Sequence, residues 1–214
     1  MRRYLFALFV AAASPLFMGA GQQAPAARIT FSDEDAATLD RVSEYLNGIT
    51  TMKGSFIQIA PSGAMTEGTF YLSKPGRIRF EYKPPVPTLI VSDGKTIAVA
   101  NTRLNTVDRY PLSETPLGLI LSNTIDLRRN SAVLSVAHQQ GSIVIGARTS
   151  KNRNKANITL VFSDPGLELR QWTVIDDQGG ATTVALRGTE PGATLAPDLF
   201  TLPTPNPFAR RRQG

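Results

Sequence analysis

The sequence contains no cysteine and only one histidine, His138. Without cysteine the chain has no disulfide, no thiolate metal site, no cysteine nucleophile and no N-terminal cysteine that could carry a lipid. A single imidazole leaves few of the histidine-dependent catalytic or metal-binding arrangements. The nucleophile-elbow, zinc-protease and P-loop signatures are absent as well. We therefore predict that the protein is not an enzyme and that it needs no metal or other cofactor.

Long apolar runs are also scarce, and the clearest one lies at the start of the chain. Leu5–Ala13 is a run of nine apolar residues that follows Arg2 and Arg3. A membrane-spanning helix needs about 20 apolar residues, so this shorter run is typical of a secretory signal peptide. We expect residues 1–21 to be the signal, with cleavage somewhere within 20–26, and the mature protein to be a soluble monomer in the periplasm.

Positive charge is concentrated at the two ends of the chain. The formal net charge is +6, but removing the five terminal arginines leaves +1 for the body; they are Arg2, Arg3, Arg210, Arg211 and Arg212. A body this close to neutral argues against a nucleic-acid-binding surface. We expect a single domain over 28–205 and a disordered basic tail over 206–214.

Two segments have the pattern of helices. Ser32 is a suitable N-cap, apolar residues follow at helical spacing, and Asn47-Gly48 supplies a stop, which predicts an amphipathic helix over 33–46. Thr115-Pro116 places proline at the first helical position, which predicts a short apolar helix over 115–122.

The rest of the chain alternates with a period of two, which is typical of antiparallel strands with one solvated face. In Arg77–Lys83 this alternation is strict, and glycine, proline and aspartate separate the segments as turn residues. The pattern predicts a mainly β (α+β) protein of about 11 antiparallel strands with a few helices. Alternation begins at residue 51, and the expected strands are 65–73, 77–83, 89–92, 96–100, 131–138, 142–148, 157–163, 167–176 and 181–188.

The sequence resembles the periplasmic outer-membrane lipoprotein carrier (LolA) family across most of 33–205. The resemblance rests on five segments in matching order: SFIQ at 55–58, GTFYLSKPGRIRFEY at 68–82, IVSDGKTI at 90–97, YPLSETPLGLIL at 110–121 and LFTLPTP at 199–205. It implies an unclosed antiparallel β-barrel with a helical lid over a hydrophobic cavity.

The same resemblance implies a carrier. Such proteins receive acylated lipoproteins from an inner-membrane ABC transporter, shield the acyl chains and deliver the cargo to an outer-membrane receptor or the outer membrane. The family's receptor is itself a lipoprotein, so a chain without cysteine resembles the carrier.

The resemblance makes the apolar face a candidate acyl cavity, although ordinary core packing explains each residue equally well. The family often has an arginine that bonds to the lid where this chain has Lys74, so Lys74 is the candidate lid latch, with an exposed turn lysine as the alternative. The candidate cavity residues are Phe56, Phe70, Leu72, Ile78, Phe80, Tyr82, Leu89 and Val91 on strands, with Leu39, Val42, Leu117, Ile120 and Leu121 on the lid.

Two other functions stay open from the sequence: a periplasmic module that binds or senses another lipid or apolar ligand, and a periplasmic hydrolase.

Phe80 offers a test of the cavity itself. If water reaches it when the lid opens, Phe80→Asp should fold but bind acylated lipoprotein poorly, whereas a dry core predicts unfolding.

Overall fold

The computed structural model describes residues 29–130, 132–148 and 158–205, so the expected signal peptide and basic tail lie outside the described residues. Its helices are α1 (Asp33–Gly48), η1 (Leu112–Glu114), α2 (Gly118–Leu121) and η2 (Pro197–Phe200), where η marks a 3₁₀ turn. Its strands are β1 (Thr51–Ile59), β2 (Met65–Ser73), β3 (Arg77–Tyr82), β4 (Thr88–Asp93), β5 (Thr96–Asn101), β6 (Thr106–Pro111), β7 (Val133–Gln139), β8 (Ser142–Ala147), β9 (Ile158–Ser163), β10 (Leu169–Ile175) and β11 (Ala181–Pro191).

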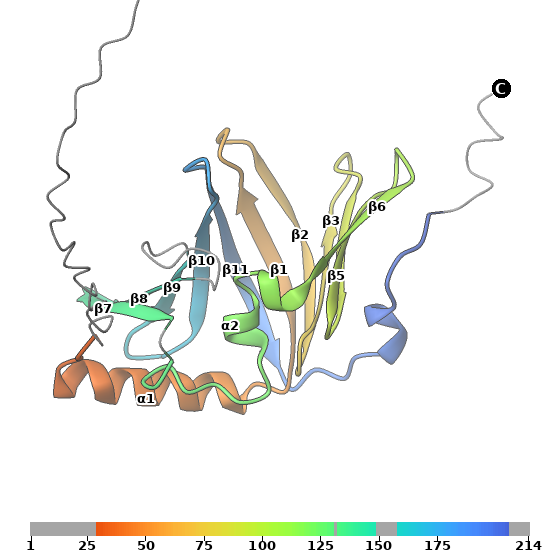
Figure 1. The fold of residues 1–214 in the computed structure, drawn as a ribbon. Helices are drawn as coiled ribbons and strands as arrows, with labels where there is room; N and C mark the ends of the chain where they lie inside the picture. Colours follow the sequence, from red (N-terminus) through yellow and green to blue (C-terminus); the bar gives the residue numbers. More distant parts are fainter. Residues whose placement is uncertain (1–28, 131, 149–157, 206–214) are drawn as a thin grey trace, which may run out of the picture.

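These strands form one antiparallel sheet of 11 strands in the order β6-β5-β4-β3-β2-β1-β11-β10-β9-β8-β7. Each half of the sheet is a run of consecutive hairpins, and the halves join where β1 pairs with β11. The outermost strands, β6 and β7, are not paired with each other, so the curved sheet is unclosed (Figure 1). The predicted fold class is confirmed.

The connection between the two outermost strands covers the sheet. After β6 the chain passes through η1, α2 and residues 122–130 before it enters β7. Figure 1 shows α1 across one end of the sheet and α2 in front of one face, which we call the inner face. Together α1 and the connection from η1 to residue 130 are named the lid.

Sequence features explain how α1 begins. The Ser32 side chain accepts a hydrogen bond from the Asp35 amide at 3.1 Å, and three acidic residues occupy the first turn, where the helix dipole favours them. The predicted helix over 33–46 is therefore confirmed, with two further residues at its end. The helix predicted over 115–122 is shorter than expected: Thr115 follows a 3₁₀ turn, and α2 has only four residues.

The outer face carries a second apolar layer. Residues that pair directly across two antiparallel strands point to the same face of the sheet. Phe80 pairs with Ile90, and both point to the inner face. Val91 pairs with Arg79 and Leu89 pairs with Glu81, so these four residues point to the outer face. The predictions that Leu89 and Val91 line the inner face are therefore wrong. Val91 is nevertheless buried, because η2 packs on β3 and β4 with Phe200 almost fully covered. With apolar cover on both sides of β4, alternation could not reveal its facing direction.

The η2 segment is held on the outer face by arginines. The Arg77 guanidinium lies 5.5 Å from the centre of the Phe200 ring, and Arg79 Nη1 donates to the Leu199 carbonyl at 3.0 Å. Further along, Arg109 donates to the Pro203 carbonyl at 2.8 Å. The chain after β11 thus belongs to the fold at least as far as Pro203.

Candidate ligand-binding cavity

Aromatic rings form the floor of the inner face, and Phe80 is at their centre. Its ring lies 5.0 Å from that of Phe56, 6.2 Å from that of Phe70 and 6.2 Å from that of Trp172. The contacts with Phe56 and Trp172 are edge-to-face, an arrangement that aromatic quadrupoles favour. We call these four residues the aromatic floor.

Two glycines make room for this floor. A Cβ on Gly54 would lie 2.8 Å from the Phe70 ring, and a Cβ on Gly68 would lie 2.7 Å from the Phe56 ring. Each ring therefore rests directly on the backbone of the neighbouring strand, which a larger residue would prevent.

The closed lid leaves almost no free space above the floor. The cavity has a volume of about 20 Å³, enough for one water molecule. Its walls come from both the lid and the sheet and are apolar except for Lys74: they are Leu46, Ile49, Met52, Phe70, Leu72, Lys74, Ile78, Ile120, Leu169, Trp172 and Leu186. A ligand of any size must therefore displace lid side chains.

Lys74 joins the sheet to α1. It lies on the same face as Phe70 and Leu72, in the turn after β2, and its Nζ donates to the Leu46 carbonyl in the last turn of α1 at 2.6 Å. Among the described residues it makes no ion pair. Burial lowers the pKa of the Lys74 ammonium from 10.5 to about 8. The geometry is that of a link between the sheet and the lid.

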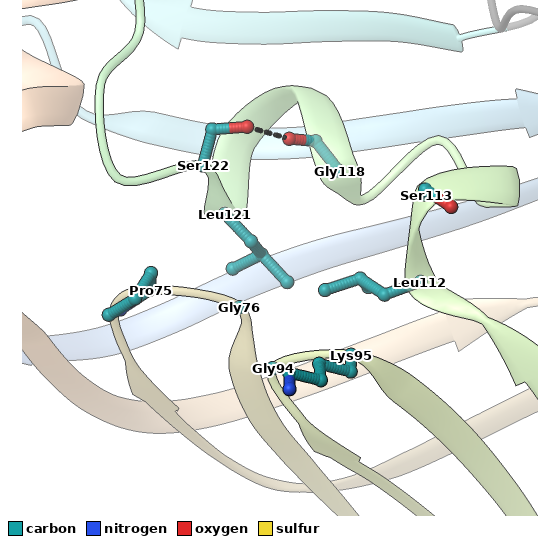
Figure 2. A pocket seen from close by; sticks show the side chains of 9 residues that line it. All are labelled: Pro75, Gly76, Gly94, Lys95, Leu112, Ser113, Gly118, Leu121 and Ser122. Atoms are coloured by element: carbon teal, nitrogen blue, oxygen red, sulfur yellow. Dashed lines mark hydrogen bonds between the residues drawn. The ribbon is translucent and has the colours of Figure 1, made fainter.

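The same turn also holds α2. The Gly76 amide donates to the Leu121 carbonyl at 2.8 Å. Figure 2 shows the adjoining surface pocket of about 420 Å³, with Leu112 and Leu121 above the turns that contain Gly76 and Gly94. Gly76 has a φ of +69°, and a Cβ there would lie 2.7 Å from the Gly94 Cα, so only glycine fits. One turn thus bonds to both lid helices.

Further hydrogen bonds tie the lid together. The Asn47 side chain donates to the Ile125 carbonyl at 2.8 Å and accepts from the Ile125 amide at 2.9 Å. The buried Ser43 hydroxyl accepts from the Leu127 amide at 2.9 Å. α1 and the 122–130 segment therefore form one unit.

The structure gathers most of the predicted cavity residues. Leu39, Val42, Phe56, Phe70, Ile78, Phe80, Ile120 and Leu121 are buried in one core cluster, and Leu72, Tyr82 and Leu117 pack against it. Sequence reasoning missed the wall residues from the other half of the sheet, Leu169, Trp172 and Leu186, although they lie in strands that it did predict. Which of these residues touch a ligand stays a prediction.

Two kinds of feature are absent from the described residues. No group of three His, Asp or Glu side chains is placed to share a metal ion. In the same part of the chain, no helix has the length and apolar character that crossing a bilayer requires.

Comparison with known proteins finds a matching family model and several similar proteins. Residues 47–203 match the family model described as outer membrane lipoprotein carrier protein LolA. The outer-membrane lipoprotein carrier protein of Dechloromonas aromatica is 26% identical over 181 residues, covering 79% of this chain and 85% of the relative. That of Chromobacterium violaceum is 26% identical over 208 residues, covering 94% of both. Among solved structures, an uncharacterized conserved protein from Thermus thermophilus aligns with a TM-score of 0.47 and 13% identity, covering 78% of this chain and 92% of that one.

Proposed function

Because the chain belongs to the outer membrane lipoprotein carrier protein LolA family, we propose that it carries acylated lipoproteins through the periplasm and shields their acyl chains beneath its lid. The observation that carries the proposal is a cavity of about 20 Å³ whose walls are apolar except for Lys74 and which separate lid elements close. Proteins of this kind bind their cargo and do not convert it, in keeping with the absence of catalytic signatures from the sequence.

Lid side chains occupy most of the space above the aromatic floor, and this suits a carrier that must also release its cargo. Burying an acyl chain is favourable by about 0.8 kcal/mol for each methylene group. To admit the chain, the lid must expose side chains such as Ile120 and Leu46, and each exposed large apolar side chain costs roughly 1.5–3 kcal/mol. This cost offsets part of the binding energy, so delivery to a membrane remains possible.

We propose that an inner-membrane ABC transporter supplies the cargo and that the outer membrane or a receptor there accepts it. The family membership and the lack of a cysteine for acylation support the carrier role. The alternative is a lipid-binding or lipid-sensing module of the same fold, for which the same cavity would hold a free lipid.

The test uses the mature protein and a dipalmitoylated lipopeptide that aggregates in water. We expect the protein to bring the lipopeptide into a complex of defined size on gel filtration, without detergent. If the lipopeptide stays aggregated, while mass spectrometry finds a free lipid bound to protein isolated from periplasm, the carrier proposal is wrong and the alternative holds.

A further inference from the structure

The aromatic floor ends in a small polar cluster, which consists of Gln58, Thr66 and Tyr82. Gln58 pairs directly with Thr66 across β1 and β2, and the Tyr82 hydroxyl donates to Gln58 Oε1 at 2.6 Å. Gly68 lies between Phe56 and Tyr82 in the register, so the Tyr82 ring packs edge-on against Phe56 at 5.0 Å. All three polar residues are half-buried on the inner face.

This cluster has unused hydrogen-bonding groups. The Thr66 hydroxyl oxygen is buried and has no hydrogen-bond partner within the described residues. In the same part of the structure, the Gln58 amide nitrogen also has no hydrogen-bond partner, but unlike the Thr66 hydroxyl it is not fully buried. Burial raises the pKa of Tyr82 to about 12, so its hydroxyl keeps its proton. Buried polar groups without partners are unusual and need an explanation.

The cluster lies at the end of the sheet that α1 does not cover. β1 runs from α1 toward Ile59, and the turn at 60–64 projects at the far end of the sheet in Figure 1. Lys74 lies at the opposite end of β2, beneath the lid. The inner face therefore runs from a polar open end, across the aromatic floor, to an apolar end closed by α1.

The length of this face fits an acyl chain in one orientation. Thr66 and Lys74 are eight residues apart on an extended strand, or about 26 Å. A lipid chain fills half of the hydrocarbon core, about 15 Å. A chain that starts at the polar cluster covers about four to five residues of the strand and ends near Phe70 and Phe80, short of the Lys74 ammonium, and its polar head faces the open end.

We propose that Gln58, Thr66 and Tyr82 form a subsite that hydrogen-bonds the ester groups joining the acyl chains to the head of a lipoprotein. This inference rests on the proposed carrier function and adds the orientation of the cargo. The Gln58 amide and the Thr66 hydroxyl supply donors for ester carbonyl oxygens, while Tyr82, whose proton goes to Gln58 Oε1, holds the Gln58 amide in place. The aromatic floor takes each acyl chain.

The experiment compares two dipalmitoyl-type lipopeptides that differ only in ester or ether linkage, because an ether has no carbonyl acceptor. The wild-type protein should bind the ester probe at least tenfold more tightly than the ether probe. The double variant Thr66→Val/Tyr82→Phe should bind both within about threefold, chiefly by weaker binding of the ester probe. The matched control Thr69→Val/Tyr71→Phe makes the same changes on the outer face of β2 and should keep the wild-type preference.

The possible outcomes separate the two proposals. If wild type binds both probes tightly and equally, or if the double variant keeps the ester preference, the cluster is structural and the subsite is wrong while the carrier function stands. If wild type binds neither probe, both proposals fail. Gln58→Met, which leaves both hydroxyls in place, gives a second measurement should the double variant fold poorly, and it should also weaken ester binding selectively.

Discussion

Single residues decide how the inner face can be used. Phe80 is 5% exposed and in contact with three aromatic rings, so it lies in a dry core when the lid is closed. Among the described residues, Lys74 is the only charged residue in the wall of the cavity, and its one side-chain hydrogen bond leads to the lid. A substitution at either residue tests how easily this interior opens.

The closed cavity changes the expectation for Phe80→Asp. A carboxylate at this site would lose its hydration without gaining a partner, so we expect the free energy of unfolding to fall by several kcal/mol. Thermal melting should show the loss, and Tyr71→Asp, on the half-exposed outer face of the neighbouring strand, should melt much closer to wild type. A Phe80→Asp protein that melts like wild type would show that water already reaches the floor.

Lys74 should make stability depend on alkaline pH. Its pKa is about 8 in the folded protein and 10.5 in the unfolded chain. Between these values the unfolded chain binds more protons, so this residue's contribution to stability rises with pH from about 8 to 10.5. Below pH 8 the cost of burying the charge is fully present.

The measurement is the difference in melting temperature between wild type and Lys74→Met, a variant that keeps every other titrating group. The melting temperature of the wild-type protein should rise relative to that of Lys74→Met as the pH rises from 7.5 to 10. A difference in melting temperature that stays constant over this pH range would mean that the Lys74 ammonium is well solvated.

At the scale of elements, the segment after β11 stabilises the sheet by packing on its outer face. η2, which contains the buried Phe200, packs on β3 and β4, and the buried Val91 lies on this outer face. Ending the chain after residue 205 should leave the melting temperature within a few degrees, as predicted for a basic tail outside the strand pattern. Ending the chain after residue 192 should lower the melting temperature strongly, because removing η2 exposes Val91 and the apolar surface that Phe200 covers. Equal melting of the two truncated proteins would contradict this role for η2.

The elements were predictable from the sequence to different degrees. β2 and β3 were found almost to the residue, because charged and apolar residues alternate and a Pro-Gly turn separates them. The facing direction of β4 was not, because Leu89, Ile90 and Val91 are all apolar and both faces are covered. The cavity walls from β10 and β11 depend on long-range pairing, which no local pattern contains, and the hydrogen bond from Lys74 to Leu46 was suggested only by family resemblance.

At the scale of the whole molecule, the sheet consists of two local halves and one long-range seam. Within each half, neighbouring strands are joined by short connections, whereas the seam pairs β1 with β11. At this seam Ser55 donates to the Arg187 carbonyl, 132 residues away along the chain. Contacts this distant in sequence close a large loop and form slowly.

Refolding should therefore protect the two halves before the seam. In pulse-labelling hydrogen exchange, we expect the amides that pair β4 with β5 and β9 with β10 to become protected first. The amides that pair β1 with β11 should follow in a later phase. Protection of the seam in the earliest phase would contradict this order.

The seam also matters while the chain is being made. At 5–20 residues per second, the ribosome completes β1 on the order of 10 s before it completes β11. During that time one edge of β1 has no strand to pair with, and unpaired strand edges are sites where chains associate. The nascent protein cannot pair β1 with β11 early, so this edge of β1 stays accessible to chaperones until nearly all of the described chain has been synthesised.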